Sequence, residues 1–181
     1  MRGALITLCC VLLLASCTNV LPPQLPTADK GPYRLDSGDK VRVIVYGESS
    51  LSTEYTVGDN GTIAFPMIGD IKARSQTVEE LQKQIKGGLK SVLVNPSVSV
   101  EISQYRPFFI VGEVGKPGEY AYSTGMNVLT AVAMAGGFTV RADENRLTVV
   151  RKKDGQPAEW SANRLSELQP GDLVVIPERF F

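Results

Sequence analysis

The sequence predicts an α+β protein that consists of two small mixed domains in tandem. Two stretches combine strand patterns, in which every second residue is apolar, with one short amphipathic helix each. The pattern restarts near Arg106-Pro107, directly after a strand that closes the first stretch. We therefore expect one domain over residues 33–105 and a second over residues 106–181, which suits the length of the chain.

The first domain is expected to begin with a strand at residues 40–46, in which every second residue is a valine. Asp59-Asn60-Gly61 is a strong hairpin-turn signal, and it leads into an alternating strand at residues 62–67. Residues 98–103 alternate between apolar and polar side chains after Asn95-Pro96. This alternation predicts a closing strand with one buried face.

Residues 77–92 carry the helix of the first domain. Thr77 and Glu80 have the spacing of a capping box, in which each side chain bonds the other residue's backbone amide. Apolar residues recur at helical spacing and form one stripe: Val78, Leu81, Ile85, Leu89 and Val92.

The second domain is expected to begin with a strand at residues 108–114, followed by a turn at Lys116-Pro117-Gly118-Glu119. A short helix at residues 127–135 stops at Gly136-Gly137, which is typical of a C-cap. Two further strands are expected, at residues 147–152 and 173–176, the latter apolar enough to be buried.

A short motif occurs once in each expected domain. Leu35-Asp36-Ser37-Gly38-Asp39 and Leu168-Gln169-Pro170-Gly171-Asp172 both read Leu-x-x-Gly-Asp and both feed a valine-rich strand. The pattern indicates the same turn in both places. Two copies agree equally well with shared turn chemistry and with a repeated unit.

The N-terminus has the pattern of a secretory signal, because a basic start precedes an apolar run too short to span a bilayer. Leu14-Ala15-Ser16-Cys17 then resembles the bacterial lipobox, in which cleavage between Ser16 and Cys17 frees the cysteine for acylation. We expect residues 1–16 to be removed and Cys17 to carry the lipid that anchors the protein to a membrane. An ordinary signal peptide with a chance cysteine is the alternative.

Four prolines follow within residues 17–32, and this composition favours an extended, semi-stiff tether between the lipid and the folded part. Thr18 stands where an aspartate retains lipoproteins at the inner membrane of enteric-type bacteria. The outer membrane is therefore favoured as the site of anchoring.

The composition argues against several classes of function. The 19 basic and 19 acidic residues balance without a basic patch, so nucleic acid is not expected as a partner. The chain has no histidine, which removes the commonest general base and the commonest zinc ligand. We expect no cofactor, no metal and no enzymatic activity.

Two groups of residues leave other functions open. Gly112, Gly115 and Gly118 fit no phosphate-binding spacing and indicate a hairpin turn. Turn positions explain most of the aspartates at 36, 39, 59, 70 and 172, although a pair of carboxylates that cleaves glycosidic bonds remains an alternative. Six aromatic residues can stack on sugar rings, with strand packing as the default: Tyr105, Phe108, Phe109, Tyr120, Tyr122 and Trp160.

Taken in order, these segments resemble the bacterial outer-membrane polysaccharide export (Wza-like) family. Its polysaccharide biosynthesis/export domain is resembled by three parts of the chain. These are the start at Tyr33–Val41, the central hairpin at Val57–Ile63 and Phe65–Gly69, and the closing strand at Asn95–Val100. The segments Val111–Gly118, Ala133–Gly137 and Leu168–Pro177 resemble its SLBB domain, a β-grasp-like module. The family-motif turns fall at nine positions: Gly38, Asp39, Asp59, Gly61, Gly112, Gly115, Gly118, Gly171 and Asp172.

The resemblance implies a conduit without a catalytic role. Members of this family form homo-oligomeric rings on the periplasmic side of the outer membrane and pass capsular polysaccharide or exopolysaccharide outward. They work with an inner-membrane polysaccharide co-polymerase.

Larger members continue through further modules to an amphipathic pore helix, and this sequence resembles the short class of export lipoproteins. A separate outer-membrane pore protein is then expected to complete the path. The alternative function is a monomeric periplasmic lipoprotein that binds glycan and transports nothing.

Overall fold

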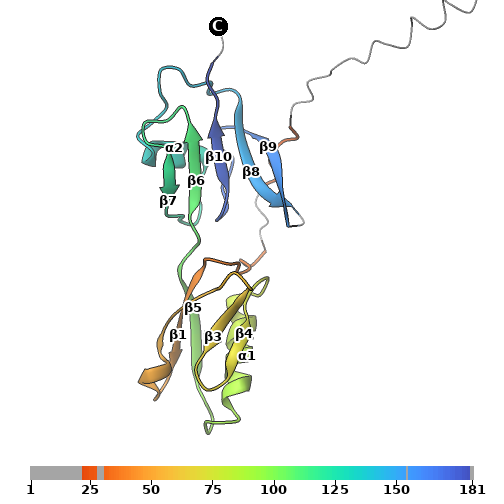
Figure 1. Cartoon of the computed structure of the whole chain (residues 1–181), viewed down its shortest axis with the longest axis vertical. Helices are drawn as coiled ribbons and strands as arrows, with labels where there is room; N and C mark the ends of the chain where they lie inside the picture. The colour runs from red at the N-terminus through yellow and green to blue at the C-terminus, as the bar shows by residue number, and fades with distance from the viewer. Residues whose placement is uncertain (1–21, 28–30, 154, 180–181) are drawn as a thin grey trace, which may run out of the picture.

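The computed structural model describes residues 22–27, 31–153 and 155–179, and it confirms the α+β class (Figure 1). Within these residues there are two α-helices and ten strands, divided between two hydrophobic cores. The two cores lie on either side of Arg106 in the sequence, and the two bodies are stacked along the long axis of the molecule (Figure 1). The expected signal peptide and Cys17 lie outside the described residues.

The first body is built around β1 (Lys40–Val45), which pairs antiparallel with β2 (Thr53–Thr56) on one side and β5 (Val98–Gln104) on the other. The inward valines of β1 are almost completely buried, as the alternation predicts. A separate two-stranded ribbon is formed by β3 (Thr62–Phe65) and β4 (Gly69–Lys72). A short 3-10 turn, η1 (Ser49–Leu51), connects β1 to β2.

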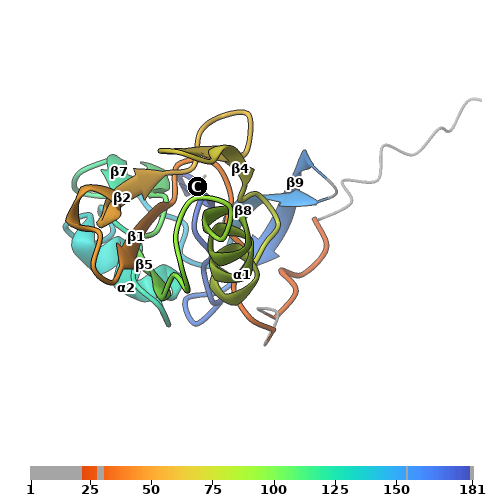
Figure 2. The same ribbon diagram turned by 90° about the horizontal axis from the view of Figure 1, so that it is seen from below.

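Helix α1 (Val78–Leu89) covers this core and packs beside β5 (Figure 2). The capping box is present, since the Glu80 amide donates to Thr77 Oγ1 at 3.3 Å and the Thr77 amide donates to Glu80 Oε2 at 2.9 Å. The helix ends at Leu89 and not at the expected Val92, because the backbone continues into a turn. Val92 is accordingly exposed.

The prediction of a hairpin at Asp59-Asn60-Gly61 is wrong. The turn itself forms, with the Gly61 amide bonded to the Gly58 carbonyl at 2.8 Å, but it connects β2 to β3, which belong to different sheets. The true hairpin joins β3 to β4, where Phe65 pairs with Gly69. Turn chemistry is local, whereas strand pairing depends on which faces are buried, and β2 is already paired with β1.

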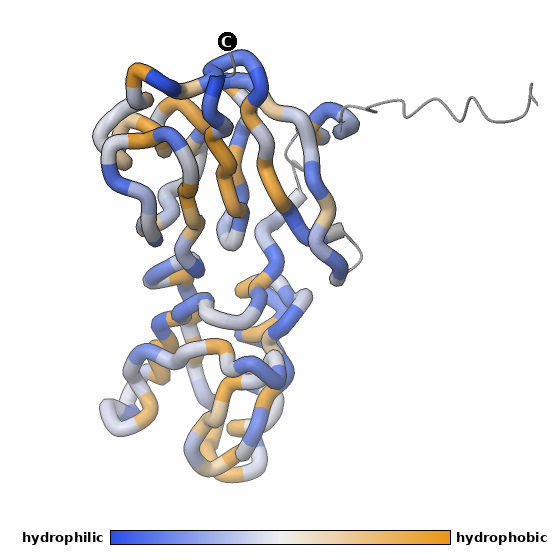
Figure 3. Tube along the Cα trace, turned by 45° about the horizontal axis from the view of Figure 1, so that its top comes forward, coloured by the Kyte–Doolittle hydropathy of each residue, from blue (hydrophilic) through white to orange (hydrophobic). Residues whose placement is uncertain are grey.

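The second body is a five-stranded sheet in the order β7-β6-β10-β8-β9, with α2 on one face. The central strand β10 (Leu173–Ile176) runs parallel to β6 and antiparallel to β8, and the tube in Figure 3 is hydrophobic along these strands. The remaining elements are β6 (Phe108–Gly112), β7 (Gly118–Tyr120), α2 (Val128–Met134), β8 (Leu147–Lys153) and β9 (Gln156–Ala162).

Strand β9 is absent from the sequence-based prediction. It carries polar residues and Pro157, which is compatible only with an outer strand or a strand end. Trp160 lies opposite the buried Val149, so its indole is half-buried on the core side of the sheet, in line with the strand packing expected by default.

Residues 22–27, which we call the N-terminal segment, dock on the second body. The Leu25 amide donates to the Ser161 carbonyl and the Ser161 amide donates to the Pro23 carbonyl, both at 2.8 Å. Leu25 also packs against the second core. The expectation that residues 17–32 form a tether outside the folded part is therefore wrong for residues 23–25, because the edge of β9 offers backbone partners that a proline-containing segment can still use.

No helix among the described residues has both the length and the apolar character needed to cross a membrane.

Candidate functional site at the junction of the two domains

The two Leu-x-x-Gly-Asp motifs form the same turn. Asp39 Oδ2 accepts the Asp36 amide at 2.8 Å, and Asp172 Oδ2 accepts the Gln169 amide at 2.7 Å. The intervening glycines, Gly38 and Gly171, both adopt positive φ, at +91° and +85°. The repeated motif is thus one structural solution used once in each body.

Arg106 lies between these two turns. Its backbone amide donates to Asp39 Oδ1 at 2.8 Å, and its Nη1 donates to Tyr33 Oη at 2.7 Å. A Cβ added to Gly38 would lie 3.4 Å from Arg106 Cβ, and one added to Gly171 would lie only 2.7 Å from Arg106 Nε. Glycine at both positions therefore leaves room for this arginine to connect the two bodies.

The carboxylate of each turn is buried beneath an arginine. Asp39 is 0% exposed and forms an ion pair with Arg106 at 3.4 Å. Asp172 is 1% exposed and is held in bidentate fashion by Arg151, with Nε to Oδ1 at 2.9 Å and Nη2 to Oδ2 at 2.7 Å. Both carboxylates are therefore committed to turn amides and arginine.

Arg74 connects the loop at Asp59 to the Gly-Asp turn of the first body. Its Nε donates to Asp36 Oδ1 at 3.1 Å, and its Nη2 donates to the Asp59 carbonyl at 2.6 Å and to Ser37 Oγ. Asp59 thus takes part in this contact through its backbone. Gly61 lies against the arginine, since an added Cβ there would stand 2.7 Å from Arg74 Cβ.

The ionisation states follow from this packing. Burial tends to raise the pKa of Asp36, but the Ser37 amide, Arg106 and neighbouring cations outweigh it, so the pKa lies below its ordinary value. Burial raises the pKa of Tyr33 far above its ordinary value. Tyr33 therefore stays protonated and donates to Asp39 Oδ2 at 2.8 Å.

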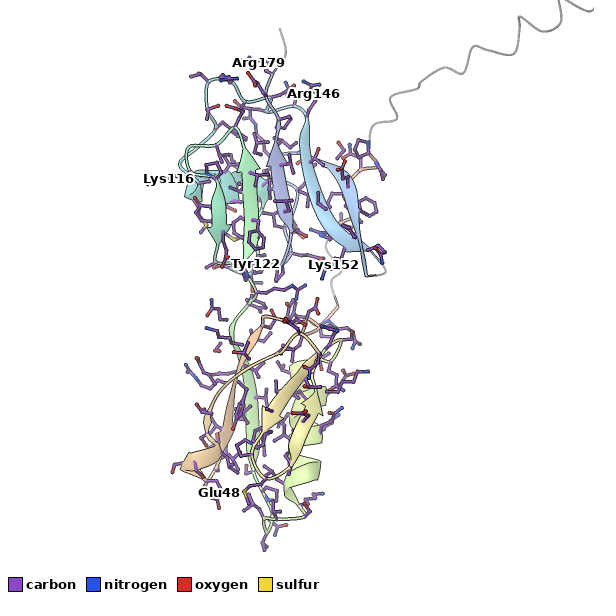
Figure 4. The ribbon with its side chains drawn as sticks, in the orientation of Figure 1. Glu48, Lys116, Tyr122, Arg146, Lys152 and Arg179 are labelled. Atoms are coloured by element: carbon purple, nitrogen blue, oxygen red, sulfur yellow. The ribbon has the colours of Figure 1, made fainter. Side chains whose placement is uncertain are left out.

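A cleft of about 940 Å³ opens between the two bodies at this junction. Figure 4 shows Lys152 on the side of the second body that faces the first, whereas Lys116 lies away from the junction. Five cations, three carboxylates and one aromatic ring line the cleft: Arg34, Arg74, Arg106, Arg151, Lys152, Asp36, Asp59, Asp172 and Phe109.

A second hollow, of about 750 Å³, contains three tyrosines that span the junction. Tyr105 contacts Tyr33 edge-to-face with ring centroids 4.9 Å apart, and Tyr122 at 5.5 Å. Figure 4 places Tyr122 at the end of the second body nearest the first. The rings pack mainly on one another, which favours a role in holding the bodies together.

The glycines of the β6–β7 connection lie outside the residues that line either hollow. Gly112 has φ +91°, and a Cβ there would lie 2.0 Å from the Ile176 carbonyl oxygen. A Cβ on Gly115 would lie 2.9 Å from the Gly136 carbonyl oxygen, while Gly118 begins β7 in open space. The positions of the first two are ones that only glycine can fill.

Sequence reasoning named the aspartates and glycines of the junction but not its arginines. Arg74, Arg106 and Arg151 occur in unrelated segments, and an arginine's partner cannot be assigned without knowing which segments meet. The position of Arg106 at the expected domain boundary was the one available signal. Among the described residues, no group of three or more acidic or cysteine side chains is arranged to hold a metal ion.

Comparison with known protein families matches both bodies. A model described as polysaccharide biosynthesis/export protein matches residues 27–103, and an SLBB domain model matches residues 107–160. Together the two matches span more than two thirds of the chain.

Similar curated proteins carry related descriptions. The exopolysaccharide production protein ExoF of Rhizobium meliloti is 34% identical over 180 residues, covering 86% of this chain and 42% of ExoF. The EPS I polysaccharide export outer membrane protein EpsA of Ralstonia nicotianae is 27% identical, covering 82% of this chain and 48% of EpsA. The polysialic acid transport protein KpsD of Escherichia coli is 24% identical, covering 81% of this chain and 28% of KpsD.

An export-type domain followed by an SLBB domain defines the class of protein to which these two bodies correspond. The chain belongs to the outer-membrane polysaccharide export family, as its sequence motifs implied. It spans less than half the length of each of these relatives.

Proposed function

We propose that this protein takes part in the export of exopolysaccharide or capsular polysaccharide across the outer membrane. The observation that carries the proposal is the match of both domains, in the same order, to proteins described by polysaccharide export or production. The protein acts as part of a homo-oligomeric ring that conducts the polymer, and not as an enzyme. Its partners are an inner-membrane co-polymerase and an outer-membrane pore protein.

Lipid on Cys17 anchors the protein to the outer membrane with its domains facing the periplasm. The docked N-terminal segment supports a particular orientation. Pro23 follows Cys17 by six positions, and at about 3.5 Å per position this stretch reaches about 20 Å at most. Pro23 is bonded to β9, so the second domain is the one held next to the membrane.

Deletion of the gene, followed by complementation, tests the export role. Cells without it should secrete little polymer and retain polymer inside, while the wild-type gene restores secretion. A Cys17→Ser gene should restore it poorly, because the product is not anchored. Normal secretion by the deletion strain would overturn the proposal.

A monomeric glycan-binding lipoprotein is the second candidate, and the polar cleft at the junction favours it over an enzyme. The mass of the native, lipidated protein in mild detergent distinguishes the two functions. A ring predicts a multiple of the protomer mass. A strict monomer that binds glycan while export proceeds without it would establish the second candidate.

A further inference from the structure

We propose that the junction cleft binds an acidic saccharide unit, with Phe109 as the stacking surface for the sugar ring and Lys152 with the neighbouring arginines as the carboxylate contacts. The identity of the ligand as part of an exported polymer rests on the proposed function. The existence of the site rests on the geometry of the cleft.

The charges at the junction are layered. The carboxylates of Asp39 and Asp172 lie buried beneath Arg106 and Arg151, whose side chains are 24% and 11% exposed. Arg74 and Arg34 have side chains that are 43% and 57% exposed. The cleft lining holds five cations against three carboxylates, Asp36, Asp59 and Asp172, so its net charge favours the entry of an anion.

The arginines present fixed donors. Arg151 bonds Asp172 through Nε and Nη2, and Arg74 bonds the loop through the same two nitrogens, so the Nη1 group of each takes no part in those bonds. Guanidinium groups held in this way lose little conformational entropy on binding a further carboxylate. Lys152 is exposed and supplies a cation that forms none of these pairs.

Phe109 gives the cleft its apolar surface. It lies on the outer face of β6, opposite Leu173, and is 41% exposed, which is unusual for a phenylalanine in a central part of a sheet. Its ring lines the same cleft as Lys152. A sugar ring with a carboxylate matches this pairing of an apolar surface with nearby cations, and the volume lies in the range of small-ligand sites.

Calorimetry with defined trisaccharides tests the inference on the purified soluble chain without residues 1–17. Trigalacturonate should bind at least about tenfold more tightly than neutral maltotriose, and its affinity should fall as salt rises. Lys152→Gln should weaken trigalacturonate binding by about tenfold, since a charge-assisted hydrogen bond is lost. Phe109→Ala should weaken the binding of both trisaccharides, because the stacking surface is lost.

Lys116→Gln is the matched control, because it removes one exposed lysine away from the junction and should leave binding unchanged. Unfolding curves check that each variant remains folded. Equal affinity for the two trisaccharides would overturn the inference. So would equal losses from Lys152→Gln and Lys116→Gln, or sulfate displacing trigalacturonate at equal concentration, which would indicate an anion site without sugar recognition.

The binding assay and the export assay together separate this inference from the proposed function. A wild-type chain that restores export in the deletion strain but fails to bind trigalacturonate overturns the acidic site alone. If the chain binds trigalacturonate as predicted but the deletion strain exports polymer normally, the export role alone is overturned.

Discussion

Arg106 makes contacts with both domains at the junction. Its backbone and side chain both bond Asp39, which is buried in the first domain, and its guanidinium lies over Gly171 of the second. A residue at a domain boundary usually belongs to a linker that makes few contacts. Here the boundary residue makes contacts with both domains, so the two are expected to move as one unit.

Two glycines with the same backbone conformation offer a matched test of this role. Gly171 and Gly137 both have φ +85°, but a Cβ on Gly171 meets Arg106 Nε at 2.7 Å and one on Gly137 meets nothing within 4 Å. Gly137→Ala should cost about 1–2 kcal/mol for the left-handed conformation alone. Gly171→Ala should cost measurably more in urea unfolding, because Arg106 must also move. Equal losses would contradict the placement of Arg106.

The buried pair of Arg151 and Asp172 should be worth far more than a surface pair. Arg151→Met leaves a carboxylate that is 1% exposed without its counter-ion, so we expect a loss of about 3–5 kcal/mol in the free energy of unfolding. Arg141→Met breaks the exposed pair with Glu178 and should cost far less, because solvent screens that pair. Urea denaturation of both variants gives the comparison, and similar losses would argue against a structural role for Arg151.

The pKa of Asp36 gives the junction a pH dependence with a definite sign. Because its folded-state pKa is lowered, its contribution to stability is present above its ordinary pKa and is lost as the pH falls through the folded value. The junction therefore weakens in acid.

Among the elements, the N-terminal segment differs most from what the sequence predicts. A stretch that reads as a linker is bonded to β9 on both sides of Gln24 and covers an edge that otherwise offers unpaired backbone groups. It thereby links the N-terminal part of the chain to the second domain, although the first domain follows it in sequence.

Leu25→Asp should detach this segment without unfolding the domain. The substitution puts a charge against the second core, and Leu25 is only partly buried there. Hydrogen exchange should then accelerate at the Ser161 amide, which donates to Pro23, while the Val149 amide inside the sheet keeps its protection. Unchanged exchange at Ser161 would show that the docking is unimportant in solution.

At the scale of the whole molecule, the long axis has two distinct ends. Val140 is 91% exposed and its carbonyl accepts Arg179 Nη2, and Arg179 lies at the far end of the second domain (Figure 4). Val94 is 95% exposed in the connection between α1 and β5, at the opposite end (Figure 1). The proposed orientation places Val140 near the membrane and Val94 far from it.

Single cysteines at these two valines test the orientation. The sequence contains cysteines only at positions 9, 10 and 17, so a mature acylated chain offers no competing thiol. A fluorophore on Val140→Cys, in lipidated protein bound to vesicles, should be quenched by lipids with spin-labelled headgroups. The same fluorophore on Val94→Cys should be quenched much less, and the reverse order would contradict the orientation.

The sequence by itself determined the features that depend on local interactions. The capping box of α1, the glycine stop after α2, the alternation of β1 and the two Gly-Asp turns all involve residues within a few positions of one another. Backbone propensity and short-range hydrogen bonds fix such features before any tertiary contact forms. The order of the motifs along the chain also identified the family.

Only the tertiary structure decided which distant segments meet. The pairing of Arg151 with Asp172, the position of Arg106 between the turns, and the bonds from the N-terminal segment to β9 join residues separated by 21 to more than 130 positions. The same is true of β2, whose neighbour is β1 and not the strand that follows the Asp59-Asn60-Gly61 turn. These contacts depend on which faces are buried together, and the periodicity of one segment carries no information about its partner.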